Sequence, residues 1–204
     1  MKTLKTIPLI GLLAFNLQVF SQDINSNTER LTVGLQGTYA HWSSDYFEQL
    51  DERDPSGIGG GIRVGYGLNQ RFEPFVRYEL QTFNLTKKWD THRLSAFSLG
   101  LRANFGGTLQ KIRPFVEIGY TIQSMKINPV ELNGKLVTFK MSGPSTGIGG
   151  GVNYFLTPQI ALNGNFNAVF GKFNSFLIDN VGSSERPDIQ TFRFSVGINY
   201  YFDF

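Results

Sequence analysis

The chain contains no cysteine, only two histidines (His41 and His92), and no long apolar run beyond its N-terminus. Without cysteine it can have no disulfide scaffold, no thiol nucleophile and no cysteine-ligated zinc or iron–sulfur centre. Two histidines are also too few for a histidine-rich metal site. Because a membrane-spanning helix needs about 20 apolar residues, a helical membrane protein is excluded as well.

Charge is sparse and nearly balanced. Only 17% of the 204 residues are charged, with 19 basic against 16 acidic side chains. This composition is typical neither of a disordered chain nor of a nucleic-acid-binding domain, so we expect no nucleic-acid partner. At about 150 residues per domain the length allows one domain or two. Glycine (23) and phenylalanine (19) are abundant, which favours a β-rich chain.

Residues 1–21 have the make-up of a secretory signal peptide. Lys2 and Lys5 precede a short apolar run, and Ser21 provides a small residue at the expected cleavage point. A membrane anchor is the alternative, but the apolar run is too short and too interrupted for it. We therefore predict a signal peptide over 1–21 and one barrel domain over 22–204. Removing the two lysines lowers the formal net charge from +3 to +1, so the basic pI says little about partners.

The C-terminal segment shows the main pattern of the chain. From Thr191 to Phe204 every even position is apolar or aromatic, and nearly every odd position is polar or small. Successive side chains of a strand lie on opposite faces, so this segment is a strand with one apolar and one polar face. A helix would scatter both sets. The same alternation recurs, giving eight predicted strands: 31–42, 57–68, 72–83, 94–105, 112–123, 147–156, 160–171 and 191–204.

The connections alternate between short and long. Short turns are predicted at 68–71, 106–111 and 156–159, whereas the other connections span 43–56, 84–93, 124–146 and 172–188. Segments near 10 residues match a tilted strand that crosses a bilayer, which takes about 9–11 residues. Short turns on one side and long loops on the other are the layout of outer-membrane barrels, and an even strand number closes the sheet.

Two glycine-rich runs, 57–61 and 147–151, repeat the sequence Gly-Ile-Gly-Gly-Gly, and Pro74-Phe-Val76 reappears as Pro114-Phe-Val116. The glycine runs are not phosphate-binding loops, because no helix pattern follows them. We expect their small residues to face a narrow, crowded lumen. The repeats support an up-and-down order of hairpins.

The end of the chain, Tyr200-Tyr-Phe-Asp-Phe204, resembles the assembly signal of Gram-negative outer-membrane barrels. With the signal peptide and eight strands, the mature chain resembles the OmpA/OmpX-type eight-stranded porin-like family over nearly its whole length. The resemblance implies an all-β, eight-stranded antiparallel transmembrane barrel in the cell outer membrane, with both termini periplasmic. It also implies recognition of Tyr200, Phe202 and Phe204 by the barrel-assembly machinery. We expect no peptidoglycan-binding domain after the barrel, unlike in the two-domain members of the family, so a cell-wall tether is not carried over from them.

Charged residues fall on the polar face of the strands. Eight strands leave an interior that side chains just fill, and a charge facing lipid would cost about 2–4 kcal/mol at the membrane midplane. We therefore predict a network of ion pairs inside the lumen, in which Glu79 and Glu117 are the acidic partners; an ion path is the alternative. The predicted network comprises Arg63, Arg77, Glu79, Arg102, Arg113, Glu117 and Arg193.

Aromatic residues near the strand ends are predicted to form girdles at the two membrane interfaces. They are Tyr39, Trp42, Tyr66, Phe105, Tyr154, Tyr200 and Phe202.

Two of the long loops carry features of their own. Loop 43–56 holds five carboxylates without the order of a calcium loop, so we expect a solvated acidic loop and no metal site. In loop 124–146 the pair Asn133-Gly134 predicts a tight turn at the tip of a protruding β-ribbon, with Pro129 limiting pairing at its base. The free edges of such a ribbon could recruit a partner strand, although a passive extension is the simpler interpretation.

A hydrolase site at the barrel rim is a minor hypothesis. His41 and Ser43 lie on one face, Asp45 or Glu48 could complete a triad, and the His-x-Ser spacing resembles that of lipid A deacylases. In those enzymes the motif comes late in the chain, so we expect no catalytic residues here. His92 is predicted to be a surface residue beside Lys87 and Lys88.

The sequence thus predicts a small monomeric outer-membrane barrel without enzyme activity, cofactor or metal. Its expected role is structural or one of surface interaction through loops 43–56 and 124–146. The alternatives are a narrow passive pore and a lipid hydrolase at the rim.

Overall fold

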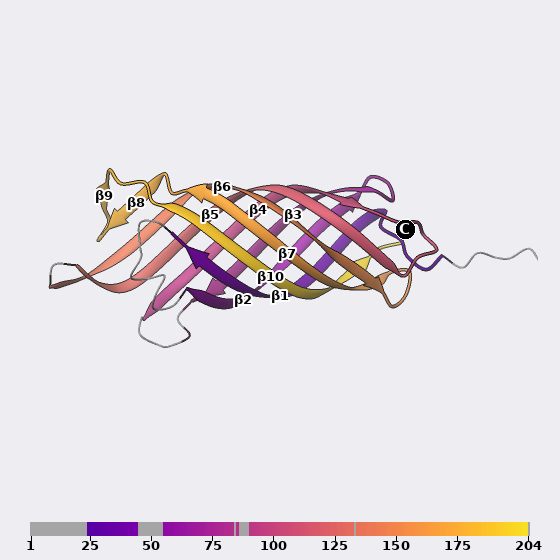
Figure 1. Ribbon diagram of the computed structural model, residues 1–204, viewed down its shortest axis with the longest axis horizontal. Helices are drawn as coiled ribbons and strands as arrows, with labels where there is room; N and C mark the ends of the chain where they lie inside the picture. Colours follow the sequence, from indigo (N-terminus) through magenta and orange to yellow (C-terminus); the bar gives the residue numbers. More distant parts are fainter. Residues whose placement is uncertain (1–23, 45–54, 84, 86–89, 133, 204) are drawn as a thin grey trace, which may run out of the picture.

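The computed structural model describes residues 24–44, 55–83, 85, 90–132 and 134–203 (Figure 1). The predicted signal peptide, most of the acidic loop (45–54), Lys87, Lys88, Asn133 and Phe204 lie outside the described residues. In the described part of the chain, no helix is long and apolar enough to cross a membrane.

The described residues form one closed antiparallel sheet. Its neighbours run in the order β5-β4-β3-β2-β1-β10-β7-β6, and a further β5–β6 pairing closes the ring. These eight strands confirm the predicted up-and-down barrel. They are β1 (Arg30–Ser43), β2 (Ser56–Gly67), β3 (Phe72–Thr82), β4 (Thr91–Asn104), β5 (Ile112–Leu132), β6 (Lys135–Phe155), β7 (Ile160–Lys172) and β10 (Asp188–Tyr201).

The barrel has its apolar side outside. Along β10, Phe194 and Val196 are 55% and 56% exposed, whereas Arg193 and Ser195 between them are 2% and 1% exposed. A soluble barrel would show the opposite arrangement. The outer wall is therefore suited to the hydrocarbon core of a membrane, because the closed sheet leaves no unpaired strand edge and the charged side chains lie inside.

The two ends of the barrel differ. We call the end with the connections 68–71, 105–111 and 156–159 the short-turn end, and the opposite end the long-loop end. The C-terminus lies at the short-turn end, whereas β8 and β9 lie at the long-loop end (Figure 1). Residues 24–29, which precede β1, also lie at the short-turn end, where Asn25 N donates to Thr108 O.

Strands β5 and β6 have 21 residues each, against 11–14 for the other barrel strands. Their paired extension reaches Leu132 and Lys135, with Gly134 at a positive φ of 73° in the turn, so the predicted β-ribbon is present. The register shifts between Ile127 and Val130, at Pro129.

The β6 edge of the ribbon is partly covered. Strand β8 (Ser175–Ile178) pairs with β6 from Phe139 to Ser142, and β9 (Val181–Ser183) pairs with β8. The expectation of two free edges therefore needs correction, because the fourth long loop folds back as a hairpin onto β6. We call β8, β9 and the ribbon (the parts of β5 and β6 beyond Met125 and Met141) the extension sheet.

Two aromatic predictions were wrong. Trp42 is fully buried inside the long-loop end rather than placed in a girdle, and His92 is 1% exposed rather than on the surface. Both residues lie on the inner face of their strands, since Trp42 shares its face with Thr38 and His92 shares its face with Arg102. The strand periodicity continues through these residues and turns them inward.

Candidate functional site

The middle of the lumen is filled by ion pairs. Arg63 Nη1 lies 2.9 Å from Glu73 Oε1, and Arg193 Nη1 lies 2.8 Å from Glu79 Oε2. Glu117 is shared, because its Oε1 lies 2.5 Å from Arg77 Nη2 and its Oε2 lies 2.9 Å from Arg102 Nη2. The structure thus brings six of the seven predicted lumen residues into ion pairs.

Glu73 was not among the predicted network residues, although it is fully buried and pairs with Arg63. Its position on the polar face of the segment 72–83 is the signal that identifies it.

Arg113, the seventh predicted residue, has neutral partners. Its Nη1 donates to Gln70 Oε1 at 2.9 Å, its Nη2 to Gln70 O at 2.5 Å, and its Nε to Phe105 O at 3.1 Å. These contacts lie at the short-turn end. Arg113 therefore ties two short turns to β5 and takes no part in the central ion pairs.

Two inward phenylalanines pack against the arginines. The Phe75 ring lies 4.7 Å from the Arg63 guanidinium carbon and 4.9 Å from that of Arg77, and Arg102 lies 3.7 Å above Phe115. Cation–π contacts of this kind stabilise desolvated guanidinium groups. The repeated Pro-Phe-Val motif is the sequence signal for both rings, since each motif places its phenylalanine at an inward position.

Neutral amides fill the wall on the opposite side. Along β7, Asn167 Nδ2 donates to Asn165 Oδ1, and Asn165 Nδ2 donates to Asn163 Oδ1, both at 2.8 Å. Asn163 Nδ2 continues the ladder to Asn153 Oδ1 at 2.8 Å, and Asn153 Nδ2 donates to the Tyr201 hydroxyl at 3.2 Å. Because each side-chain amide both donates and accepts, the hydrogen bonds within this ladder are made without any charged residue.

The short-turn end is closed by residues 24–29, which we call the latch. Asn25 N and Ser26 N both donate to Thr108 O, Asn27 N donates to Pro158 O at 3.1 Å, and Thr28 N donates to Gln70 Oε1 at 3.2 Å. One segment thereby bonds to all three short turns. A small apolar cluster of Phe155, Ala161 and Tyr201 lies inside the same end.

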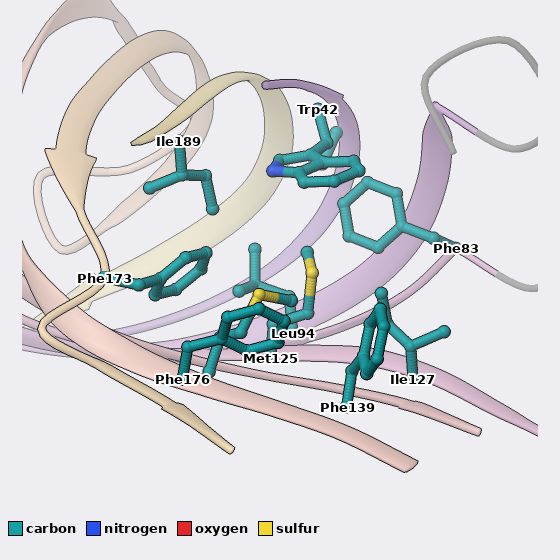
Figure 2. Packing of buried hydrophobic residues seen from close by; sticks show 11 residues of the cluster. Trp42, Phe83, Leu94, Met125, Ile127, Phe139, Phe173, Phe176 and Ile189 are labelled. Carbon is teal, nitrogen blue, oxygen red and sulfur yellow. The ribbon is translucent and has the colours of Figure 1, made fainter. Parts of the chain in front are cut away.

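The long-loop end is closed by an apolar plug (Figure 2). Its members come from strands and connections around the barrel and share near-complete burial; they are Ala40, Trp42, Phe83, Leu94, Met125, Ile127, Phe139, Met141, Phe173, Phe176 and Ile189. Phe139 and Phe176 meet edge to face at 5.2 Å between ring centroids, which joins β6 to β8. The sequence analysis predicted a polar inner face and missed this plug. The inner face is polar in the middle of the barrel but becomes apolar toward the long-loop end.

The predicted girdle is partly present. Tyr39, Tyr66, Phe105, Tyr154 and Tyr200 are each 45–53% exposed on the outer wall. Phe202 is half-buried just beyond β10, and Phe204, the last residue of the expected assembly signal, is outside the described residues.

The rim motif has a different partner from the one expected. His41 opposes Ser56 in the β1–β2 register, and its Nδ1 lies 3.3 Å from Ser56 Oγ, which also accepts from Tyr39 Oη at 2.8 Å. Asp45 and Glu48 lie outside the described residues. Among the residues that are described, no cluster of three or more His, Asp or Glu could hold a metal ion.

Comparisons with known proteins agree with this architecture. The model of the outer membrane protein beta-barrel domain family matches residues 7–202. Comparison with curated proteins finds no match.

Solved structures show the same fold. Neisserial surface protein A is 20% identical with a TM-score of 0.58, over 84% of this chain and 97% of that one. Ail, the attachment invasion locus protein of Yersinia pestis, is 13% identical with a TM-score of 0.56, over 86% and 100%. OprG from Pseudomonas aeruginosa is 13% identical with a TM-score of 0.53, over 89% and 100%.

Proposed function

The chain belongs to the outer membrane protein β-barrel family, as an OmpA/OmpX-type barrel. We propose that this barrel is sealed and that it acts at the cell surface through its extension sheet. In this proposal the short-turn end and both termini face the periplasm. The barrel is a monomer held by outer-membrane lipid, and the assembly machinery recognises its C-terminal segment through Tyr200, Phe202 and Phe204. The chain is no enzyme.

The observation that carries the sealed lumen is its filling at three depths. The latch and Tyr201 close the short-turn end, the ion pairs fill the middle, and the plug around Trp42 closes the long-loop end. An ion would have to displace fully buried aromatic side chains and then pass through paired charges. A close-packed interior opens only when side chains or backbone rearrange.

The extension sheet supports the surface role. Leu136 at its tip and Val181 at the turn between β8 and β9 are each 71% exposed, and Leu132 is 40% exposed. Strand β9 is the outer edge of this sheet, so its backbone groups on that side are open to pairing. An extended segment of a partner protein can add to such an edge by main-chain hydrogen bonds.

Single-channel recording tests the sealed lumen. Refolded protein, verified by its heat-dependent gel shift, is added to planar bilayers beside a general porin as positive control. We expect no discrete conductance steps from the folded barrel. Reproducible steps would replace this proposal by the narrow passive pore.

A further inference from the structure

We propose that a small cavity inside the barrel, beside Arg77 and Arg193, binds a single small inorganic anion of halide size. The proposal does not depend on the surface role of the extension sheet. It rests on the charge of the interior, on hydrogen-bond donors that lack acceptors, and on the space left by two facing glycines.

The described interior carries more positive than negative charge. Its buried ionic side chains are Arg63, Glu73, Arg77, Glu79, Arg102, Arg113, Glu117 and Arg193, five basic and three acidic. Glu73 and Glu79 each neutralise one arginine, but Glu117 must serve both Arg77 and Arg102. One positive charge therefore remains in that triad, and burying an uncompensated charge is strongly unfavourable.

The same region has a surplus of donors. Arg77 Nε, Arg102 Nη1 and Arg193 Nε are buried and have no hydrogen-bond partner. Both oxygens of Glu117 already accept from guanidinium groups. A buried donor without an acceptor costs about 1–3 kcal/mol, so the region favours a ligand that only accepts hydrogen bonds.

A cavity of about 20 Å³ lies within this region. Arg77, Arg193 and Glu117 line it together with Ser98, Thr121 and Asn167. Ser98 Oγ and Thr121 Oγ1 are 2.8 Å apart and share one hydrogen bond, which leaves the second hydroxyl hydrogen for another acceptor. The wall thus offers guanidinium and hydroxyl donors, and its one carboxylate is held by arginines.

Two glycines create the space. Gly119 and Gly147 oppose each other in the β5–β6 register and both line the cavity. A Cβ at Gly119 would lie 3.2 Å from Leu99 O, and one at Gly147 would lie 3.3 Å from Val169 Cγ2. One water-sized ligand needs roughly 10–15 Å³, so the cavity suits a halide and excludes phosphate or sulfate. Water also fits, but it brings no charge to offset the extra arginine.

Halide dependence of stability tests the site. The barrel is refolded in sodium chloride, sodium bromide or sodium gluconate at equal ionic strength and pH, and its thermal midpoint is followed by the gel shift. We expect the midpoint to rise saturably with chloride and bromide but not with gluconate. In Gly147→Ala, whose methyl group takes up the cavity, this halide dependence is lost. Gly164→Ala is the matched control, because a Cβ there meets nothing within 4 Å, and it retains the dependence.

Crystals grown in bromide give a second readout that does not require any variant to fold. An anomalous peak between Arg77 and Arg193 supports the site. Equal wild-type midpoints in chloride and gluconate, with no anomalous peak, would show that water fills the cavity and overturn the proposal. A halide effect that persists in folded Gly147→Ala would place the anion elsewhere and overturn it as well.

Discussion

At the residue scale, Glu117 is the charge on which the interior depends most. It is 4% exposed, and among the described residues it is the only carboxylate within ion-pair distance of Arg77 and of Arg102. A neutral amide at this position keeps the shape but removes the negative charge and turns one acceptor into a donor. Two arginines would then remain buried with no carboxylate between them.

We therefore expect Glu117→Gln to lower the free energy of unfolding by about 3–5 kcal/mol, as in other buried pairs that lose one member. Urea unfolding of the refolded barrel in lipid vesicles measures the change. Glu185→Gln is the control, because Glu185 is exposed and its replacement should cost less than about 0.5 kcal/mol. Equal midpoints for the two variants would mean that water, not Glu117, compensates the arginines.

The position of a residue in the strand alternation predicts whether its side chain faces the lumen or lipid better than its residue type does. The alternation places Glu73, Phe75 and Trp42 inside, yet Trp42 was assigned to a girdle because tryptophan is common at membrane interfaces. The inward position of Trp42 follows from Thr32 and Thr38, which share its face of β1. The alternation does not predict which residues form ion pairs, because that depends on the register between strands.

At the scale of elements, the alternation was sufficient for all eight barrel strands, because each has a lipid-facing side that must stay apolar. It did not predict β8 and β9, which have four and three residues. Strands this short carry no usable periodicity. They form because the extended β6 has an open edge with which β8 can pair. This depends on the fold around residues 175–183 and not on their own sequence pattern.

The tip of the extension sheet should be separable from the barrel. Replacing residues 129–137 by Asn-Gly keeps the inner pair Ile127 and Phe139, which belongs to the apolar plug. We expect this variant to retain the gel shift and to change the urea midpoint little. Cells that display it should attach less well to protein-coated surfaces than cells displaying the wild type, because Leu132 and Leu136 are gone while the β9 edge remains.

Phe139→Ala serves as the contrasting variant. It leaves the tip in place but opens the plug, and loss of a buried phenylalanine costs about 3–5 kcal/mol. If the shortened chain fails to refold while Phe139→Ala folds, the tip is part of the folding core and not an independent surface element.

At the scale of the whole molecule, the latch joins the three short turns into one unit. Deleting residues 22–28 removes the hydrogen bonds to Thr108, Pro158 and Gln70, each worth about 0.5–1.5 kcal/mol. We expect a lower urea midpoint but no conductance, because the ion pairs and the plug remain. Deleting only residues 22–24 is the control, since the hydrogen bonds of Asn25 to Thr28 stay. Channel activity of the longer deletion would show that the latch is the principal seal.

The membrane placement of the whole molecule could be predicted from the sequence, because every buried arginine and glutamate takes the inner face of its strand and the outer face is apolar. The layered filling of the lumen could not. Alternation tells which side of the wall a residue takes, but depth along the axis depends on strand tilt and stagger. Met125 and Glu117 thus share the inward parity of one strand, although one lies in the apolar plug and the other in the ion pairs.

The asparagine ladder has a consequence for how the barrel is built into the membrane. Of the eight buried ionic side chains that are described, seven lie on β2 to β5, and only Arg193 lies on the three strands that carry the ladder, β6, β7 and β10. The C-terminal wall can therefore enter lipid with almost no charge to desolvate. In the N-terminal half, Arg63 and Glu73, and likewise Arg102 and Glu117, lie on neighbouring strands and can pair before the ring closes. Glu79 of β3 meets Arg193 of β10 only when β1 and β10 join to close the ring.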